Sequence, residues 1–485
     1  MSLQSRDLIR IDDLTNAEIE TVLAVATEME EGIRDQAHRC PGAILATLFF
    51  EPSTRTRLSF EAAICRLGGK IISVAEMRTT SLAKGESLAD TARVVGHYAD
   101  VVVVRHPWEG SARLMADFSD APVINGGDGG HEHPTQTLCD LYTLRREKGR
   151  LTGLNVALCG DLLHGRTIHS LAYALARFGA NILCLPGKGL GLPDDVKQKL
   201  QVDYRCRPEI SRFGQARQGG DVRSALSGSD VVVLTPSRPH QLSLFTKVEE
   251  SIPEIASRID ALYVTRAQKE RFEVSPDAKA TEEEARQDYP IVDKAFLQQK
   301  HFKETLVLHP LPRVDELSSE IDSDPRSRYF EQAARGVPVR MALFSLLLGA
   351  HSGPKAIAVE SHAVSLGAGY KALIYRSPIG VRCENDQCVS VRESSHVVPE
   401  FWVTEGAQPS RKGKPTGDAS PRLQCVYCDT DLQPAYVGHL KSRRYRPVDG
   451  SLSLESGKWV FFSSREEAEA QGFKPAGRAG KIELD

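Results

Sequence analysis

Short apolar runs alternate with helical patterns from residue 43 to about residue 310. Four runs are predicted to be strands, at 44–50, 101–104, 154–159 and 231–233. Two segments with helical periodicity are 59–67, which stops at Gly68-Gly69, and 167–178, which stops at Gly179. Short apolar strands that alternate with helices indicate parallel sheets covered on both faces. We therefore predict an α/β protein with two doubly wound parallel-sheet domains, because two sheets fit this length better than one.

Breaks in this pattern predict the domain organisation. A polar break at Lys148-Gly149-Arg150 precedes a fresh strand–loop–helix unit, and the composition changes after an apolar helix at 341–348. The predicted segments are a first domain at 1–148 with a helix at 327–350 packing back on it, a second domain at 149–326 joined to the first by interdomain helices, a linker at 351–371, a small β-rich domain at 372–446 and a C-terminal appendage at 447–485. The stretch 410–421 is polar and rich in Gly and Pro, so we predict a flexible loop there.

Composition and charge exclude several classes of protein. The 485 residues carry a formal net charge of −3, which argues against general affinity for nucleic acid or anionic membranes. Residues 1–13 lack the apolar core of a signal peptide. The longest apolar run near the middle, 342–350, is far shorter than the ~18 residues of a membrane span. We therefore predict a cytoplasmic protein without a membrane span.

One polar motif stands where a phosphate site would be expected. Ser53-Thr-Arg-Thr-Arg57 lies between a predicted strand and a predicted helix. A helix start offers unpaired N–H groups and favours an anion, and Arg55 adds a guanidinium suited to phosphate. An ordinary Ser/Thr helix cap with exposed arginines is the alternative.

Two further loops strengthen the phosphate interpretation. The segment 105–110 follows the strand at 101–104, and 131–136 leads from a glycine-rich stretch into a helix. In a parallel sheet the carboxyl ends of the strands line one crevice. We therefore expect Arg105, His133 and Gln136 to converge on the ligand of the Ser53–Arg57 motif.

As a set, these motifs resemble the aspartate/ornithine carbamoyltransferase family over residues 6–350. The resemblance rests on Ser53–Arg57, on Ser81–Thr91 and on His133-Pro-Thr-Gln136. Three later motifs, 160–167, 263–271 and 309–313, are similar to the aspartate branch. An aspartate substrate brings two carboxylates and therefore needs cations. The resemblance implies carbamoyl transfer from carbamoyl phosphate to L-aspartate, an early step of pyrimidine biosynthesis.

The resemblance also implies a role for each motif residue and for the two domains. Domain 1–148 would bind carbamoyl phosphate and domain 149–326 aspartate. Carbamoyl phosphate would contact Ser53, Thr54, Arg55, Thr56, Ser81, Lys84, Arg105, His133, Gln136, Leu311 and Pro312. Aspartate would contact Arg166, Arg266 and Gln268. The expected catalytic residues are Arg55, Thr56, Arg105, His133 and Gln136. No cofactor is expected for catalysis.

Family members supply the counterparts of Ser81 and Lys84 from a neighbouring subunit. The resemblance therefore implies a homotrimer, or a pair of trimers, with shared active sites. Two departures affect the segment that closes over substrate in the family: the chain is longer than a compact member between 207 and 259, and 272–289 is an acidic insertion.

Four cysteines near the C-terminus predict a metal site. Cys383-x4-Cys388 and Cys425-x2-Cys428 have the ligand spacing of a closed structural zinc site. The pattern resembles the zinc domain of the regulatory chain of aspartate carbamoyltransferase, fused here to the catalytic part. The nucleotide-binding domain of that chain has no room before residue 372, so we predict no nucleotide feedback through it. The fused domain is expected to dock as a structural clamp.

Two other functions stay open from the sequence alone. One is a transcarbamoylase that uses another amine acceptor. The other is an inactive transferase-like scaffold that carries a nucleic-acid-binding zinc ribbon, for which Lys441, Arg443, Arg444 and Arg446 give some basis. The filled catalytic motifs argue against the second. The segment 459–475 is predicted to be a small strand–helix unit without a metal.

Overall fold

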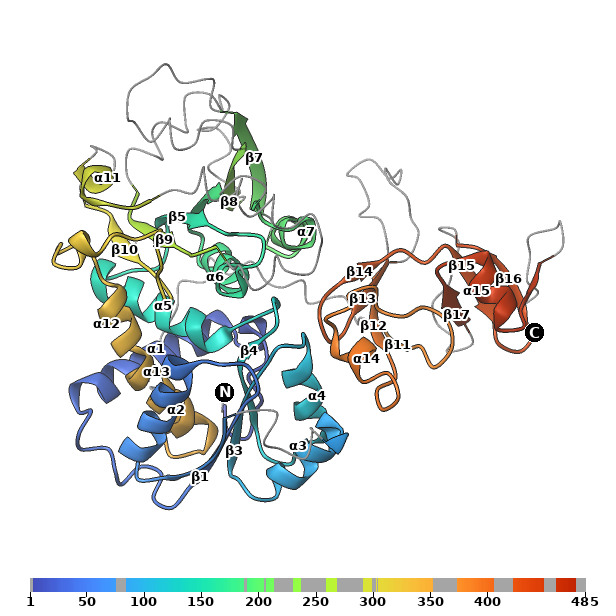
Figure 1. The fold of residues 1–485 in the computed structure, drawn as a ribbon, viewed down its shortest axis with the longest axis horizontal. Coiled ribbons are helices and arrows are strands. Elements are labelled where there is room, and N and C mark those ends of the chain that lie inside the picture. The colour runs from blue at the N-terminus through green and yellow to red at the C-terminus, as the bar shows by residue number, and fades with distance from the viewer. Residues whose placement is uncertain are drawn as a thin grey trace.

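The computed structural model describes residues 3–75, 84–186, 190–204, 206–212, 230–236, 259–267, 291–298, 302, 304–351, 373–404, 422–448 and 459–476. It contains two α/β domains and two small C-terminal sheets (Figure 1). Several predicted features lie outside these residues: Ser81, Gln268, the acidic insertion 272–289, most of 207–259, nearly all of the linker 351–371 and the loop 410–421. Within the described ranges, no helix is long and apolar enough to cross a membrane.

The first domain is built on a parallel sheet with strand order β2-β1-β3-β4. Its strands are β1 (Ile44–Phe49), β2 (Lys70–Val74), β3 (Val101–His106) and β4 (Val123–Asp128). Its helices are η1 (Ile11–Asp13), α1 (Asn16–Glu31), α2 (Thr54–Arg66), α3 (Leu88–Gly96), α4 (Ser111–Phe118) and α5 (Pro134–Lys148). The predicted strands at 44–50 and 101–104 are confirmed, and they pair in register with Leu45 beside Val101.

The second domain has a six-stranded sheet in the order β10-β9-β5-β6-β8-β7. Four strands are parallel: β5 (Asn155–Gly160), β6 (Asn181–Pro186), β9 (Ala261–Val264) and β10 (Leu306–Leu308). Two further strands extend this sheet in antiparallel fashion: β8 (Asp230–Pro236) and β7 (Cys206–Arg212). The predicted strand at 231–233 exists, but it runs antiparallel to β6, because an apolar run marks a strand without fixing its direction.

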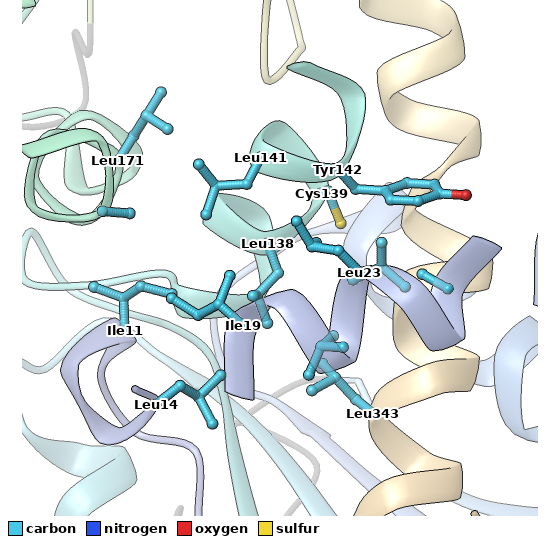
Figure 2. Packing of buried hydrophobic residues seen from close by; sticks show 14 of the residues in the cluster. Ile11, Leu14, Ile19, Leu23, Leu138, Cys139, Leu141, Tyr142, Leu171 and Leu343 are labelled. Carbon is cyan, nitrogen blue, oxygen red and sulfur yellow. The ribbon is translucent and has the colours of Figure 1, made fainter. Parts of the chain in front are cut away.

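Among the described residues, the two domains also contain the helices α6 (Arg166–Arg177), α7 (Asp194–Val202), α11 (Lys294–Gln298), η6 (Ser319–Ile321), α12 (Tyr329–Ala334) and α13 (Gly336–Leu347). One core cluster runs through both of them and is closed by α13, which packs against α1 and α2. Figure 2 shows buried side chains of α1, α5 and α13 in this cluster, among them Leu23, Leu138 and Leu343. Helix α13 thus lies against the first domain, and the span of the predicted helix at 327–350 contains two helices, α12 and α13.

The C-terminal part forms two small sheets. The first has the antiparallel strands β11 (Leu373–Arg376), β12 (Glu400–Thr404), β13 (Arg422–Cys425) and β14 (Asp431–Leu432), with the short helix α14 (Val389–Arg392). The second has β15 (Tyr436–His439), β16 (Arg444–Pro447), β17 (Trp459–Phe462) and β18 (Lys474–Pro475), with α15 (Arg465–Ala470). This second sheet crosses the predicted boundary at 446/447. Tyr445 of β16 packs with Val460, Phe462 and Phe473, so the division between the sheets falls between β14 and β15.

Candidate active site and metal centre

A cavity of about 380 Å³ lies between the two α/β domains, where several strand ends and helix starts meet. Its lining comprises Glu51–Thr56, Ser59, Arg105, His133, Gln136, Arg166, Thr167, Thr265, Arg266, His309–Pro312, Gln332, Ala333 and Arg340. The structure therefore brings together eleven of the predicted substrate residues: Ser53, Thr54, Arg55, Thr56, Arg105, His133, Gln136, Arg166, Arg266, Leu311 and Pro312. Lys84 is exposed and is not among the described residues that line this cavity.

The phosphate loop follows β1 and opens α2. Ser53 occupies the N-cap position with an extended backbone, and no acidic residue stands in the first turn of the helix. Partial burial and the positive charge of Arg266 lower the pKa of Arg55 below its usual value. Two guanidinium groups from different domains therefore share one cavity, which is the arrangement expected for a ligand with several negative charges.

Glu51 links two buried arginines. Its Oε2 accepts a hydrogen bond from Arg166 Nη1 at 2.9 Å and lies 3.3 Å from Arg105 Nε. Arg105 Nη1 also donates to the carbonyl of Gly126, and Arg166 Nη1 to that of Gly129. The cations are thus held by fixed acceptors while they face the cavity.

Gly127 makes room for these two arginines. Its φ is +114°, and a Cβ at this position would lie 3.0 Å from Arg166 Cζ and 3.1 Å from Arg105 Nη1. A side chain here would therefore be strained and would displace both cations.

His133 begins α5 and is almost fully buried. Burial lowers the pKa of His133 well below its usual value, and neighbouring positive charges lower it further. These charges belong to Arg105, Arg166 and Arg340. The imidazole is therefore neutral at physiological pH and can donate one ring N–H without losing a proton.

The turn after β10 is fixed by its own histidine. His309 Nδ1 accepts a hydrogen bond from the Leu311 backbone N–H at 2.8 Å, and His309 Nε2 lies 2.9 Å from Glu316. The peptide bond between Leu311 and Pro312 is cis. This turn brings Leu311 and Pro312 to the cavity wall.

Sequence reasoning missed several residues of this site. Glu51 stands two residues before Ser53 of the phosphate motif but was not assigned a role. Arg340 lies in the apolar helix α13, is only 3% exposed, and places its guanidinium 4.5 Å from the Phe60 ring centroid. A single arginine within an apolar helix is a signal that could have identified it, because a buried charge needs a partner.

The four predicted metal ligands also come together. Their sulfur atoms all lie within 4.8 Å of one another, and all four cysteines are buried without a disulfide. The Sγ–Sγ distance is 3.4 Å for Cys383–Cys428 and 3.8 Å for Cys388–Cys425. A tetrahedral site with Zn–S bonds of about 2.3 Å has S–S edges of about 3.8 Å. The cluster therefore fits the size and donor chemistry of a four-thiolate zinc site.

The sheet β11–β14 with α14 contains these cysteines and is called the cysteine module below; it docks on the loop between β3 and α4. Glu109 N donates to Gln387 O, and Val389 N donates to Glu109 O, both at 2.9 Å. Gly110 has a φ of +79°, and a Cβ there would lie 2.5 Å from Tyr427 Cβ. This close backbone approach ties the cysteine module to the first domain.

Asp429, the residue after Cys428, carries the ionic part of this contact. Its carboxylate lies 2.9 Å from Arg10 Nη1, 3.4 Å from His131 Nε2 and 3.5 Å from Lys199 Nζ. Burial alone would raise the pKa of Asp429, but these neighbouring cations hold it well below its usual range. One carboxylate of the module thus pairs with cations of both α/β domains, since Arg10 and His131 belong to the first and Lys199 to the second.

Replacing Asp429 by alanine is expected to destabilise the docked module, because three partly buried cations lose a partner. Breaking a buried ion pair typically costs about 3–5 kcal/mol. The urea midpoint of unfolding, followed by tryptophan fluorescence, should fall clearly for Asp429→Ala. Asp431→Ala is the matched control, since Asp431 is exposed. Equal midpoints for the two variants would contradict the assignment.

Two family models match the sequence. One is the carbamoyl-P binding domain of aspartate/ornithine carbamoyltransferase, over residues 6–146, and the other is the Asp/Orn binding domain of the same family, over residues 238–347. The catalytic subunit of aspartate carbamoyltransferase from Methanopyrus kandleri is 43% identical over 349 residues, which cover 72% of this chain and 99% of that protein. The corresponding subunit of Thermococcus gammatolerans is 44% identical over 355 residues, again 72% of this chain and 99% of that protein.

Solved structures agree with these matches. The catalytic subunit of M. jannaschii aspartate transcarbamoylase is 39% identical, with a TM-score of 0.55, and the match covers 72% of this chain and 100% of that one. Aspartate transcarbamoylase from Trypanosoma cruzi, in complex with carbamoyl phosphate and aspartate, is 33% identical, with a TM-score of 0.57 and coverage of 71% and 98%. The chain therefore belongs to the aspartate/ornithine carbamoyltransferase family.

Proposed function

We propose that this chain is an aspartate carbamoyltransferase, which transfers the carbamoyl group of carbamoyl phosphate to the amine of L-aspartate. The observation that carries this proposal is the interdomain cavity, in which Arg55 of the phosphate loop shares one space with Arg166 and Arg266 of the second domain. A dianionic phosphate and a dicarboxylic amino acid together require this excess of cations. The family relationship and the relatives' names support the same reaction.

Within this proposal, the phosphate is held at the start of α2. The hydroxyl groups of Ser53, Thr54 and Thr56 and the first backbone N–H groups of α2 serve as donors, and Arg55 adds a charged one. Arg166, Arg266 and Gln268 are assigned to the two carboxylates of aspartate. Gln268 lies outside the described residues, so its assignment rests on the family resemblance.

The reaction requires stabilisation of the carbonyl oxygen. The aspartate amine attacks the carbonyl carbon, a C–N bond forms, and negative charge develops on that oxygen. The C–O bond to phosphate then breaks, and the leaving phosphate accepts the proton that the amine nitrogen loses. Arg105 and the neutral His133 are the donors assigned to this oxygen, together with Thr56. Fixed donors of this kind are typically the largest contribution to such catalysis. Gln136 and the Leu311 carbonyl accept from the carbamoyl NH2 group.

We propose that the active sites are shared within a homotrimer, or within a pair of trimers. Ser81 and Lys84 are assigned to the cavity of a neighbouring subunit, and the exposed position of Lys84, away from the cavity of its own chain, supports this. Light scattering should give a mass of three or six chains. A monomer that is fully active at assay concentration would contradict the proposal.

We propose zinc as a structural ion held by Cys383, Cys388, Cys425 and Cys428, and no metal or organic cofactor for catalysis. The clustering of four buried thiols supports this assignment. Bound zinc would cross-link two loops of the cysteine module, which docks on the first domain through Glu109 and Asp429. Location in the cytoplasm and the absence of nucleotide feedback stay predictions.

The test is product formation with a panel of amines. Carbamoyl aspartate should form from carbamoyl phosphate and L-aspartate, and L-ornithine, L-glutamate and L-asparagine should give little product. Arg55→Ala should lower kcat/KM for carbamoyl phosphate by about 10- to 100-fold, since a hydrogen bond to a charged group contributes about 1.5–3 kcal/mol.

Arg66→Ala is the matched control, because Arg66 is exposed at the other end of the same helix. If product forms only with another amine, that amine is the carbamoyl acceptor in place of aspartate. No product from any amine would favour an inactive scaffold instead.

A further inference from the structure

The side-chain amide of Gln136 can face the cavity with its oxygen or with its nitrogen. Only one of these two orientations can bind a carbamoyl group. The oxygen must point to the substrate NH2, because an amide nitrogen there would place donor against donor. Gln136 Nε2 donates to Asp140 Oδ1 at 2.8 Å. An ionised carboxylate only accepts, so Asp140 can pair with the Gln136 nitrogen and not with its oxygen.

Asp140 lies one helical turn after Gln136 on α5 and is fully buried. Its carboxylate accepts two more hydrogen bonds, from Tyr263 Oη at 2.9 Å and from Gln332 Nε2 at 2.6 Å. The three donors come from α5, β9 and α12. Gln136 and Gln332 donate to Oδ1 of Asp140, whereas Tyr263 donates to Oδ2, so the oxygen that faces Gln136 has partners other than the tyrosine hydroxyl.

The same network reaches the second group that accepts a hydrogen bond from the carbamoyl NH2, the Leu311 carbonyl. Gln332 Oε1 accepts from the His309 backbone N–H at 2.9 Å, and His309 Nδ1 accepts from the Leu311 N–H at 2.8 Å. Asp140 is therefore connected on one side to the Gln136 amide and on the other to the turn that carries the Leu311 carbonyl. Each donor in this hydrogen-bond network faces an acceptor, and reversing one side-chain amide would break the network.

We propose that Asp140 is a positioning residue that turns the Gln136 oxygen towards the cavity and so selects an acyl phosphate bearing NH2 over one bearing a methyl group. This inference rests on the proposed function. Acetyl phosphate has nearly the same shape and the same phosphate as carbamoyl phosphate, but its methyl group cannot donate. Bound acetyl phosphate leaves the Gln136 oxygen and the Leu311 carbonyl unpaired, which a desolvated site penalises.

The test compares two ligands in one assay. The readout is selectivity, defined as the inhibition constant of acetyl phosphate divided by the KM of carbamoyl phosphate. Asp140→Asn should lower selectivity about tenfold, because the new side-chain NH2 can donate to the Gln136 oxygen and allow the amide to reverse. Asp140→Glu, which keeps the carboxylate, should retain most of the selectivity. Assays at about pH 8.5 keep Asp140 ionised, since burial raises its pKa to about 7.

Tyr263→Phe is the matched control for a purely structural role. It removes a different hydrogen bond of the same carboxylate and does not touch Gln136. This variant should lose stability and keep its selectivity. Asp140→Ser, which is smaller than aspartate, is the second test if the asparagine variant does not fold.

Two results separate the possible failures. If the parent enzyme forms no carbamoyl aspartate, the proposed function fails and this inference fails with it. If the parent turns over but Asp140→Asn or Asp140→Ser lowers selectivity no more than Tyr263→Phe does, Asp140 is only structural and the inference alone is overturned.

Discussion

Replacing Arg105 by alanine is expected to lower kcat for carbamoyl aspartate formation by about 10²–10³-fold. Arg105 is only 9% exposed, lines the cavity and is held by Gly126 O and Glu51. Its guanidinium is therefore positioned before the charge on the carbonyl oxygen develops, so the loss should affect the transition state more than substrate binding. The KM values for both substrates should change much less than kcat.

Arg105→Lys and Arg113→Ala are the companion variants. The lysine keeps a positive charge but loses the planar fork, so kcat should stay well below that of the parent enzyme. Arg113 is exposed on the next helix, where it pairs with Asp117, and its removal should leave kcat nearly unchanged. A kcat for Arg105→Ala within threefold of the parent would remove Arg105 from the carbonyl site.

Replacing Cys425 by serine is expected to abolish zinc binding and to unfold the first C-terminal sheet. Structural zinc sites bind their ion with about 10–16 kcal/mol in small zinc-finger peptides, and the ion is then a main source of folding energy. Cys425 ends β13 at the centre of the module, and its side chain is fully buried. Parent protein should contain about one zinc per chain by atomic absorption, and Cys425→Ser should contain almost none.

Limited proteolysis gives a second readout of this change. The variant should be cut rapidly within 373–404 and 422–448, outside the predicted flexible loop at 410–421, whereas the two α/β domains stay resistant. Cys184→Ser is the matched control: Cys184 is equally buried, but it lies in β6, far from the cysteine cluster in the chain. Full zinc content in Cys425→Ser, or a metal-free parent, would refute the zinc site.

Much of the cavity could be predicted because its residues stand at positions that topology brings together. Arg105 and His133 lie at a strand end and a helix start, and parallel sheets gather such points along one edge. The cysteine cluster was predictable for a related reason, since the spacing within each of the two cysteine pairs is itself typical of a zinc site.

Residues whose role depends on a partner distant in the sequence could not be found in this way. Asp140 is important because Tyr263 and Gln332 donate hydrogen bonds to it, and no feature of the nearby sequence indicates either contact. Asp429 looks like an ordinary turn residue until the docked module places it beside Arg10 and Lys199. The direction of β8 was equally hidden, because valine runs are alike in parallel and antiparallel strands.

The docking of the cysteine module on Glu109 has a consequence for association. Between separate chains, contacts such as Glu109 with Gln387 and Val389 would dissociate on dilution. Here both sides belong to one polypeptide, so the module meets its binding surface at an effective concentration of the order of millimolar, whatever the amount of enzyme. Modest contacts then suffice for nearly complete occupancy, and every catalytic domain is accompanied by one module at any dilution.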